Sequence, residues 1–283
     1  MKRILVMCIV VVLLGGALAL SQRVPTPEEK GRAAVIKLFQ SLSEPQKKVA
    51  ALAWTDNARG AIRFPTEGTG TPISQMSAEQ KMLVDDLLRA TLSDFGLKRC
   101  QEMGGTGRVT FFGTPKDGER FACRIDKNNH LTLFHTEFGK EPGGEFGPIV
   151  LGAKGAGVAT VWIEEDKLAQ ELAAALTPDD AKKIKGKGIL IGELSEKPRL
   201  QARKLLEQRL AIFSTVSRKV ADDAIGHDGG IDKLRIVLTG DAGKSINDGG
   251  NFSWTITSAS FSCNWQFAGK NHPHMTLKAK RPG

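Results

Sequence analysis

The chain has 283 residues, a formal net charge of +9 and a hydrophobic content of 41%. This length suits one large domain or two small ones, with ample apolar residues for a core. The excess of cations does not predict nucleic-acid binding, because the densest basic runs, around Lys185 and Lys280, contain no aromatic residue and the chain has no tyrosine. Single-strand binding needs aromatic platforms among the cations, so we expect a solvated basic face and no nucleic-acid partner.

The first twenty residues have the pattern of an export signal. A short positive segment precedes an uncharged run from Ile4 to Leu20, and Ala17-Leu18-Ala19 supplies the small residues of a cleavage site. We predict a signal peptide over residues 1–19 and a linker over residues 20–25. The protein is then exported to the periplasm or the extracellular space, with no membrane span after cleavage. The alternative is an uncleaved N-terminal anchor, because the run forms a helix of about 26 Å, at the short end of a bilayer span.

Helix starts recur along the chain with the same chemistry. Thr26, Ser43 and Ser77 each stand three residues before a Glu or Gln, which is the pattern of a capping box. Thr177-Pro178 begins another helix, because proline needs no hydrogen-bond partner at the first helical position. The expected helices cover residues 27–42, 44–54, 78–92, 165–176, 178–185 and 198–213, the last continuing towards residue 224.

Short apolar segments separated by turn residues follow two of these helical regions. The expected strands cover residues 109–113, 120–125, 130–137, 234–239, 252–258, 260–267 and 274–280. Their close spacing suits antiparallel hairpins, whereas the Gly- and Pro-rich residues 138–157 are expected to form a surface loop. Helices and strands without strict alternation predict an α+β fold. We expect a single domain over residues 26–283, with a mainly antiparallel sheet, flanking helices and no internal repeat.

A series of short landmarks gives the chain a family resemblance. They are residues 72–80 leading to Leu87-Leu88 and Leu92-Ser93, then Phe112-Gly113-Thr114-Pro115, His130-Leu131-Thr132-Leu133, Glu141-Pro142, Glu164-Glu165 and Asn271-His272-Pro273-His274. In this order they resemble the bacterial family catalogued as domain of unknown function 3500, over nearly all of the chain after the signal. Where that family tends to have Gly-His-His, this chain has Asn128-Asn129-His130, and Phe121-Ala122-Cys123 stands where the family tends to have Trp-x-Trp. The resemblance implies an exported protein with this order of elements, and it implies no activity.

Three of the five histidines form a candidate metal site. His272 and His274 are two residues apart, so on a strand they share one face with their Cα atoms about 6.5–7 Å apart. His130 begins another expected strand and is the natural third ligand if the two strands are neighbours. Three imidazoles with an open position would suit Zn or Cu. The alternative is that these histidines are hydrogen-bonded at the edge of the core. His135 is expected on the opposite face from His130, and His227 in a solvated loop.

The cysteines and tryptophans are expected to belong to the core. Cys100, Cys123 and Cys263 remain after cleavage of the signal, and an odd number leaves at least one free thiol. We expect all three to be buried and free, with a disulfide as the alternative in an oxidising compartment. The tryptophans, Trp54, Trp162, Trp254 and Trp265, are expected in the core, with a ligand platform as the alternative.

Two functions compete at this point. The chain lacks the G-x-S-x-G and H-E-x-x-H motifs, so the leading hypothesis is a non-catalytic binding or structural protein of the cell envelope. Its partner would be a small ligand or an envelope component of unidentified chemistry. The alternative is a metal-dependent enzyme or metal-binding protein that uses His130, His272 and His274. Bound Zn would activate water for hydrolysis, and Cu would open redox chemistry.

Overall fold

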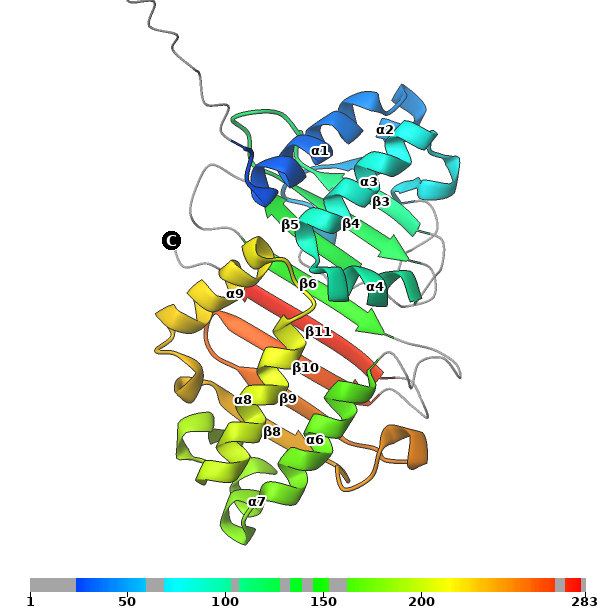
Figure 1. Cartoon of the computed structure of the whole chain (residues 1–283). Helices are drawn as coiled ribbons and strands as arrows, with labels where there is room; N and C mark the ends of the chain where they lie inside the picture. Colours follow the sequence, from blue (N-terminus) through cyan, green and yellow to red (C-terminus); the bar gives the residue numbers. More distant parts are fainter. Residues whose placement is uncertain are drawn as a thin grey trace, which may run out of the picture.

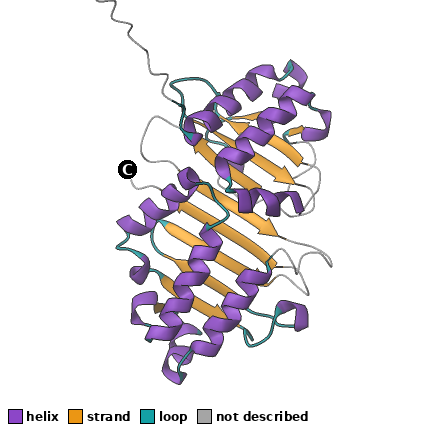
Figure 2. Ribbon diagram, viewed as in Figure 1, coloured by secondary structure: helices purple, strands orange, loops and turns teal. Residues whose placement is uncertain are grey.

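The computed structural model describes residues 24–59, 69–102, 107–127, 133–138, 145–152, 162–267 and 273–280. The signal peptide predicted over residues 1–19 lies outside this part of the chain. Helices pack against one face of a mostly antiparallel sheet (Figures 1 and 2), which is an α+β fold, as predicted. None of the described helices is long and apolar enough to cross a membrane.

The elements follow the expected order, with additional short ones. The helices are α1 (Pro27–Ser41), α2 (Glu44–Ala50), α3 (Ala78–Thr91), α4 (Asp94–Glu102), α6 (Ile163–Ala175), α7 (Pro178–Ile184), α8 (Glu196–Leu210) and α9 (Thr215–His227). The strands are β1 (Ala51–Leu52), β2 (Thr71–Pro72), β3 (Gly107–Phe112), β4 (Phe121–Lys127), β5 (Leu133–Phe138), β6 (Glu145–Gly152), β7 (Ile189–Leu190), β8 (Arg235–Thr239), β9 (Ser253–Thr257), β10 (Phe261–Phe267) and β11 (Pro273–Lys280).

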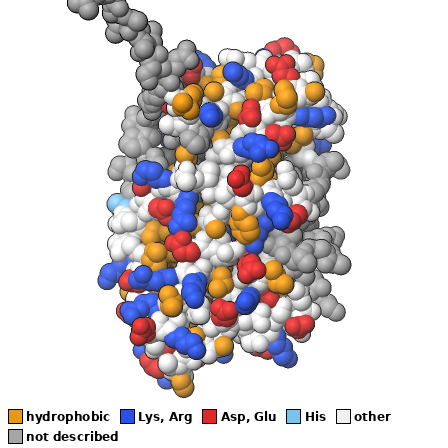
Figure 3. Space-filling model, in the orientation of Figure 1, with side chains coloured by type: hydrophobic (Ala, Val, Ile, Leu, Met, Phe, Trp, Pro, Cys, Tyr) orange, Lys and Arg blue, Asp and Glu red, His pale blue; other side chains and the backbone are white. Residues whose placement is uncertain are grey.

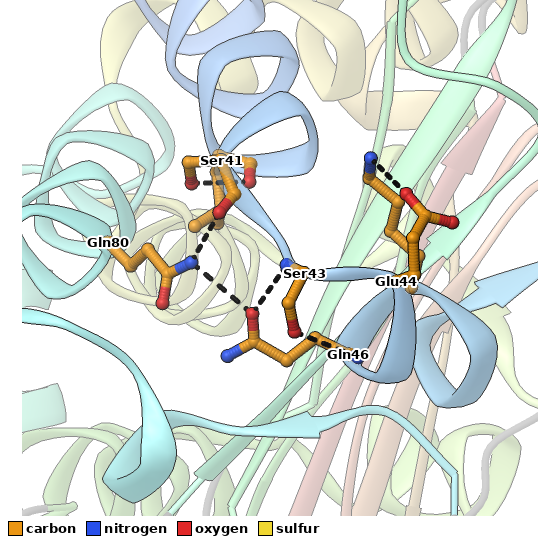
Figure 4. Close-up of polar contacts among 7 residues, drawn as sticks. Ser41, Ser43, Glu44, Gln46 and Gln80 are labelled. Carbon is orange, nitrogen blue, oxygen red and sulfur yellow. Dashed lines mark hydrogen bonds and ion pairs between the residues drawn. The ribbon is translucent and has the colours of Figure 1, made fainter.

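The predicted capping boxes are present and also join neighbouring helices. The backbone N–H of Ser43 donates to Oε1 of Gln46 (2.9 Å), which closes the box at the start of α2. The side-chain amide of Gln80, from α3, donates to the carbonyl oxygen of Ser41 (2.8 Å) and to Oε1 of Gln46 (3.4 Å; Figure 4). Each cap of this kind contributes about 1 kcal/mol, and this network fixes the ends of α1, α2 and α3 together.

The sheet consists of two equivalent halves joined edge to edge. Its order is β1-β3-β4-β5-β6-β11-β10-β9-β8-β7, with β2 also paired to β3. The first half (residues 27–152) and the second half (residues 163–280) each contain two helices, a short strand with a 3₁₀ turn, two more helices and four antiparallel strands. β6 pairs with β11 at the centre (Figure 1). The expectation that the chain has no internal repeat was therefore wrong.

Equivalent residues in the two halves make equivalent contacts. Gly70 and Gly188 precede β2 and β7 with positive φ angles of 84° and 76°, a conformation that glycine adopts without strain. Arg108 donates to the carbonyl oxygen of Gly70 (3.2 Å), and Arg235 donates to that of Gly188 (2.9 Å). Arg108 and Arg235 thus hold the same position in β3 and β8.

A pseudo-two-fold axis passes between the segments that link α3 to α4 and α8 to α9. The backbone N–H of Ser93 donates to the carbonyl oxygen of Ile212 (3.0 Å), and that of Ser214 donates to the carbonyl oxygen of Thr91 (3.0 Å). Each serine hydroxyl also donates to the preceding carbonyl oxygen of the other segment, at 2.7 Å in both cases. These reciprocal contacts join the helix layers of the two halves.

Three sequence expectations differ from the structure at element boundaries. Residues 138–157, expected as a loop, contain β6, because pairing with β5 and β11 on both sides supplies the hydrogen bonds of a central strand. The helix expected from residue 198 towards residue 224 is two helices, since Ser214 caps a new one. The helix expected to end near residue 54 ends at Ala50, where β1 begins.

The core lies between the helices and the sheet. Trp254 on β9 and Trp265 on β10 face the helices and are at most 1% exposed, as is Trp162, so three of the four tryptophans confirm the core expectation. Trp54 is half-buried beneath the guanidinium of Arg59, 4.0 Å from its ring centroid. Cys100, Cys123 and Cys263 are all buried and free, as predicted.

Candidate functional site on the outer face of the sheet

The face of the sheet that points away from the helices is called the outer face. In the second half, Thr255, Asn264 and Thr276 lie side by side on β9, β10 and β11 and are half-buried. Oδ1 of Asn264 accepts hydrogen bonds from the hydroxyl (2.5 Å) and the backbone N–H (3.2 Å) of Thr276. The neighbouring residues on these strands, such as Trp254, point into the core. The middle of this face in the second half therefore presents short, uncharged hydrogen-bonding side chains.

A second row of residues runs across the same face. Arg235, Thr257, Ser262 and Lys278 are paired in register on β8, β9, β10 and β11, and we call them the cationic row. Adjacent strands are about 4.8 Å apart, so the two cationic residues of the row have backbones about 14 Å apart. The four strands that form this surface contain no Asp or Glu. The row therefore carries two positive charges with two hydroxyl groups between them.

The first half carries a buried ion pair at the corresponding place. Arg108 is paired in register with Asp126 of β4, just as Arg235 is paired with Thr257. Nε of Arg124 donates to Oδ2 of Asp126 at 2.9 Å, and these two side chains are 4% and 1% exposed. The carboxylate of the first half thus corresponds to the hydroxyl of Thr257 in the second half.

Burial controls the chemistry of Asp126. It raises the pKa of this carboxyl from 3.8 to about 6, although Arg124 acts in the opposite direction. Among the described residues, Oδ1 of Asp126 and Oγ1 of Thr110 have no hydrogen-bond partner. On the same face, Leu52 and Trp54 pack against Phe112 and Ala122. The acid is therefore closed to solvent and titrates close to neutral pH.

Of the predicted metal ligands, only His274 lies within the described residues. It is half-buried on the outer face, where its backbone pairs with Gly152 of β6 and Gln266 of β10. His130 and His272 lie outside the described residues. The strand that follows His130, β5, is separated from β11 by β6. The described part of the chain contains no group of three His, Cys, Asp or Glu residues that could hold a metal.

The remaining two histidines lie on other elements, α9 and β5. His227 is the last residue of α9 rather than part of a loop, and it is exposed, as expected. Its Nδ1 lies 3.1 Å from Oδ1 of Asp228. The pKa of Asp228 is lowered to about 2, chiefly by the nearby hydroxyl of Ser258, together with hydrogen bonds from the backbone N–H (2.7 Å) and hydroxyl (3.1 Å) of Ser260. His135 pairs with Arg124 in the register of β4 and β5.

A second buried polar cluster lies under the helices, where the two halves meet. Nη1 of Arg99, from α4, is 2.5 Å from Oε1 of Glu165, from α6, and both side chains are buried. Arg209 of α8 is fully buried nearby, and burial lowers its pKa. Burial also raises the pKa of Cys263 to about 12, against the effect of Arg209. This cluster is closed to solvent and joins the first half to the second.

Comparison with protein-family models, with curated proteins and with solved structures found no match. The family resemblance seen in the sequence therefore stays a prediction. Sequence reasoning missed the cationic row, although a signal was present. Ser253, Thr255 and Thr257 alternate with Trp254 and Ile256, so a strand that buries Trp254 and Ile256 turns the three hydroxyl residues to the opposite face. The polar members of the same alternation form the exposed surface.

Proposed function

We propose that this chain is an exported, non-catalytic binding protein of the cell envelope, which binds its ligand on the outer face of the second half. The observation that carries the proposal is the half-exposed array of Thr255, Asn264 and Thr276. Hydroxyl and amide groups both donate and accept hydrogen bonds, so the array suits a polar ligand. The hydrogen-bonded pairing of β9, β10 and β11 keeps these groups at fixed spacing, which lowers the entropic cost of binding.

The accessibility of the titratable groups supports binding rather than catalysis. Asp126 has a raised pKa, a common property of catalytic acids and bases, but it is 1% exposed and cannot meet a substrate on the surface. Glu165 and Arg209 are fully buried under the helices. On β8, β9, β10 and β11, the outer-face side chains are hydroxyls, amides, cations, Val237 and the imidazole of His274. No carboxylate stands among them to pair with that imidazole, so this set favours binding over acid–base catalysis.

Retention on purified bacterial cell walls tests this proposal. The Thr255→Val, Asn264→Leu, Thr276→Val triple variant removes the hydrogen-bonding groups and preserves side-chain size. We expect it to co-sediment with the walls several-fold less than the wild type. A Thr215→Val, Gln208→Leu variant makes the same kind of change on the helix face and should bind as the wild type does. Equal retention of all three proteins, or release of soluble wall fragments that is lost in the triple variant, would contradict the proposal.

The metal-binding function remains a second candidate because of one feature of the register. The first residues of β5 and β11 both flank the end of β6, where Gly152 pairs with His274. Strands on the two sides of β6 are about 9.6 Å apart, and His130 and His272 precede these two strand starts in the sequence. Metal analysis of protein purified without chelator or a His tag, with a His272→Ala, His274→Ala control, tests it. Stoichiometric Zn or Cu that is lost in the control supports this candidate, and metal-free wild type after soaking in both ions refutes it.

A further inference from the structure

We infer that the ligand of the outer face is an acidic polysaccharide, which lies across the strands along the cationic row. This inference rests on the proposed function and names the chemistry of the ligand. It would place carboxylates of the polysaccharide against Arg235 and Lys278, and its hydroxyl groups against Thr257 and Ser262.

The comparison of the two halves gives the first reason. Arg108 and Arg235 make the same contact with an equivalent glycine, so the fold positions both guanidinium groups in the same way. In the first half, the residue opposite the arginine is the carboxylate Asp126, whereas in the second half it is Thr257. Asp126 is itself paired with Arg124, and both members of that ion pair are replaced by threonines in the second half. Arg235 therefore stands on four strands that contain no Asp or Glu, and an anionic ligand would supply a counter-charge there.

The spacing of the row gives the second reason. Arg235 is exposed on β8 and Lys278 is exposed on β11, about 14 Å apart across three strand intervals. Lys280 lies opposite Glu145 of β6 in the register and is left out of the row for that reason. Two separated cations with hydroxyl groups between them match an extended chain that alternates carboxylates and hydroxyls. A single small anion would occupy only one end of the row.

The character of the surface argues against other polyanions. Binding to a membrane surface uses apolar side chains that enter the headgroup region, and no large exposed hydrophobic residue occurs on β8, β9, β10 or β11 in their described parts. Single-stranded nucleic acid requires exposed aromatic platforms, whereas Trp254 and Trp265 are buried against the helices. The helix face, in contrast, mixes cations with anions (Figure 3).

The test uses polygalacturonate as the acidic polysaccharide and dextran as the neutral one. Thr257→Asp rebuilds in the second half the carboxylate that the first half already has. We expect it to weaken binding of polygalacturonate by about fivefold or more, because it compensates Arg235 and repels the ligand. Lys278→Gln removes the other cation from an exposed position and should weaken binding by a similar factor. Thr215→Asp and Lys204→Gln make the same charge changes on the helix face and should leave affinity unchanged.

The outcomes separate this inference from the function on which it rests. The inference is supported if the protein binds polygalacturonate but not dextran, and if this binding is weakened by salt, by Thr257→Asp and by Lys278→Gln but not by the two helix-face variants. Equal binding of phosphatidylglycerol vesicles or single-stranded DNA, with the same loss in the row variants, overturns the assignment to a polysaccharide. If polygalacturonate does not bind while cell-wall retention still depends on Thr255, Asn264 and Thr276, the inference fails and the proposed function stands. Thermal unfolding of each variant checks that the fold is intact.

Discussion

The two halves of this protein share one architecture and differ most on the outer face of the sheet. In the first half, Arg124 and Asp126 form an ion pair that is closed to solvent. In the second half, the equivalent surface is open and carries neutral hydroxyls and two unmatched cations. Both members of the ion pair are exchanged for threonine at the equivalent positions, Arg124 for Thr255 and Asp126 for Thr257.

The difference shows how a duplicated fold can divide its tasks. A buried ion pair pays a large desolvation cost, so it adds little net stability, although removal of one partner is strongly destabilising. The charged side chains of this pair on the outer face of the first half, Arg124 and Asp126, are buried and closed to solvent. The outer face of the second half keeps its polar groups in contact with water, where they are available to a ligand.

The largest expected effect comes from breaking the ion pair of the first half. Arg124→Leu leaves the Asp126 carboxylate buried without its guanidinium, and we expect a loss of about 3–5 kcal/mol in the free energy of unfolding at pH 7. Arg235→Leu, on the open half, should cost less than about 1 kcal/mol. Urea unfolding at pH 7 measures both. Equal losses in the two variants would show that the two outer faces are equally buried.

A pH dependence should separate the halves in a second way. The folded pKa of Asp126 is raised to about 6 from 3.8, so the folded state holds this proton more tightly than the unfolded state does. The stability that results, about 3 kcal/mol, is fully present below the unfolded pKa and is lost as the pH rises through the folded pKa, with a loss of about 2 kcal/mol between pH 4 and pH 6. Asp126→Asn should lack this decline, when urea unfolding is compared at pH 4 and pH 6.

The control for the pH experiment is Thr257→Asp. It places a carboxyl at the equivalent position of the second half, where solvent reaches it and Arg235 favours its ionised form. This variant should keep the decline of the wild type and add none of its own. A decline that persists in Asp126→Asn would assign the proton to another group.

Much of the fold could be predicted from the sequence because local chemistry specifies it. The caps at Thr26, Ser43, Ser77 and Thr177 were found from residue types alone, and all four are present. Alternation of apolar and polar residues likewise placed β9 and β10. β6 was missed because Gly147 and Pro148 obscure its pattern. Its strand conformation depends on partners on both sides, which the sequence does not show.

The repeat and the candidate site depend on contacts that are distant in the sequence. Gly70 and Gly188 are equivalent because Arg108 and Arg235 donate to them, and no local pattern connects the members of each pair. The cationic row joins residues from four strands whose order was unknown. Thr257 has no distinctive chemistry in the sequence, unlike the histidines, and it stands out only when the register places it at the position of Asp126.

The linked helix layers offer a smaller, sharper test of the two-fold relation. A Cβ atom on Gly96 would lie 1.9 Å from the carbonyl oxygen of Ile212. Gly96→Ala therefore forces the reciprocal segments apart, and we expect a loss of about 1–3 kcal/mol in urea unfolding. Ser217 holds the equivalent position in α9, since both backbone N–H groups donate to the cap serine three residues earlier. The structure already accommodates a Cβ atom at Ser217, so Ser217→Ala should cost less than about 1 kcal/mol in the free energy of unfolding. A larger loss in Ser217→Ala than in Gly96→Ala would contradict the equivalence of the two positions.

The smallest expected effect on the free energy of unfolding concerns the thiols, since each half contains a buried cysteine on its sheet. Cys123 on β4 and Cys263 on β10 are buried and free, and burial raises the pKa of both, that of Cys263 to about 12. Thiolates are the reactive form of cysteine, so iodoacetamide at pH 8 should label neither residue in the folded protein and both in urea. Addition of reductant should leave the free energy of unfolding unchanged, because no disulfide joins the described cysteines. A loss of about 2–5 kcal/mol on reduction is the signature of a structural disulfide, and it would mean that the thiols are paired rather than packed as part of each core.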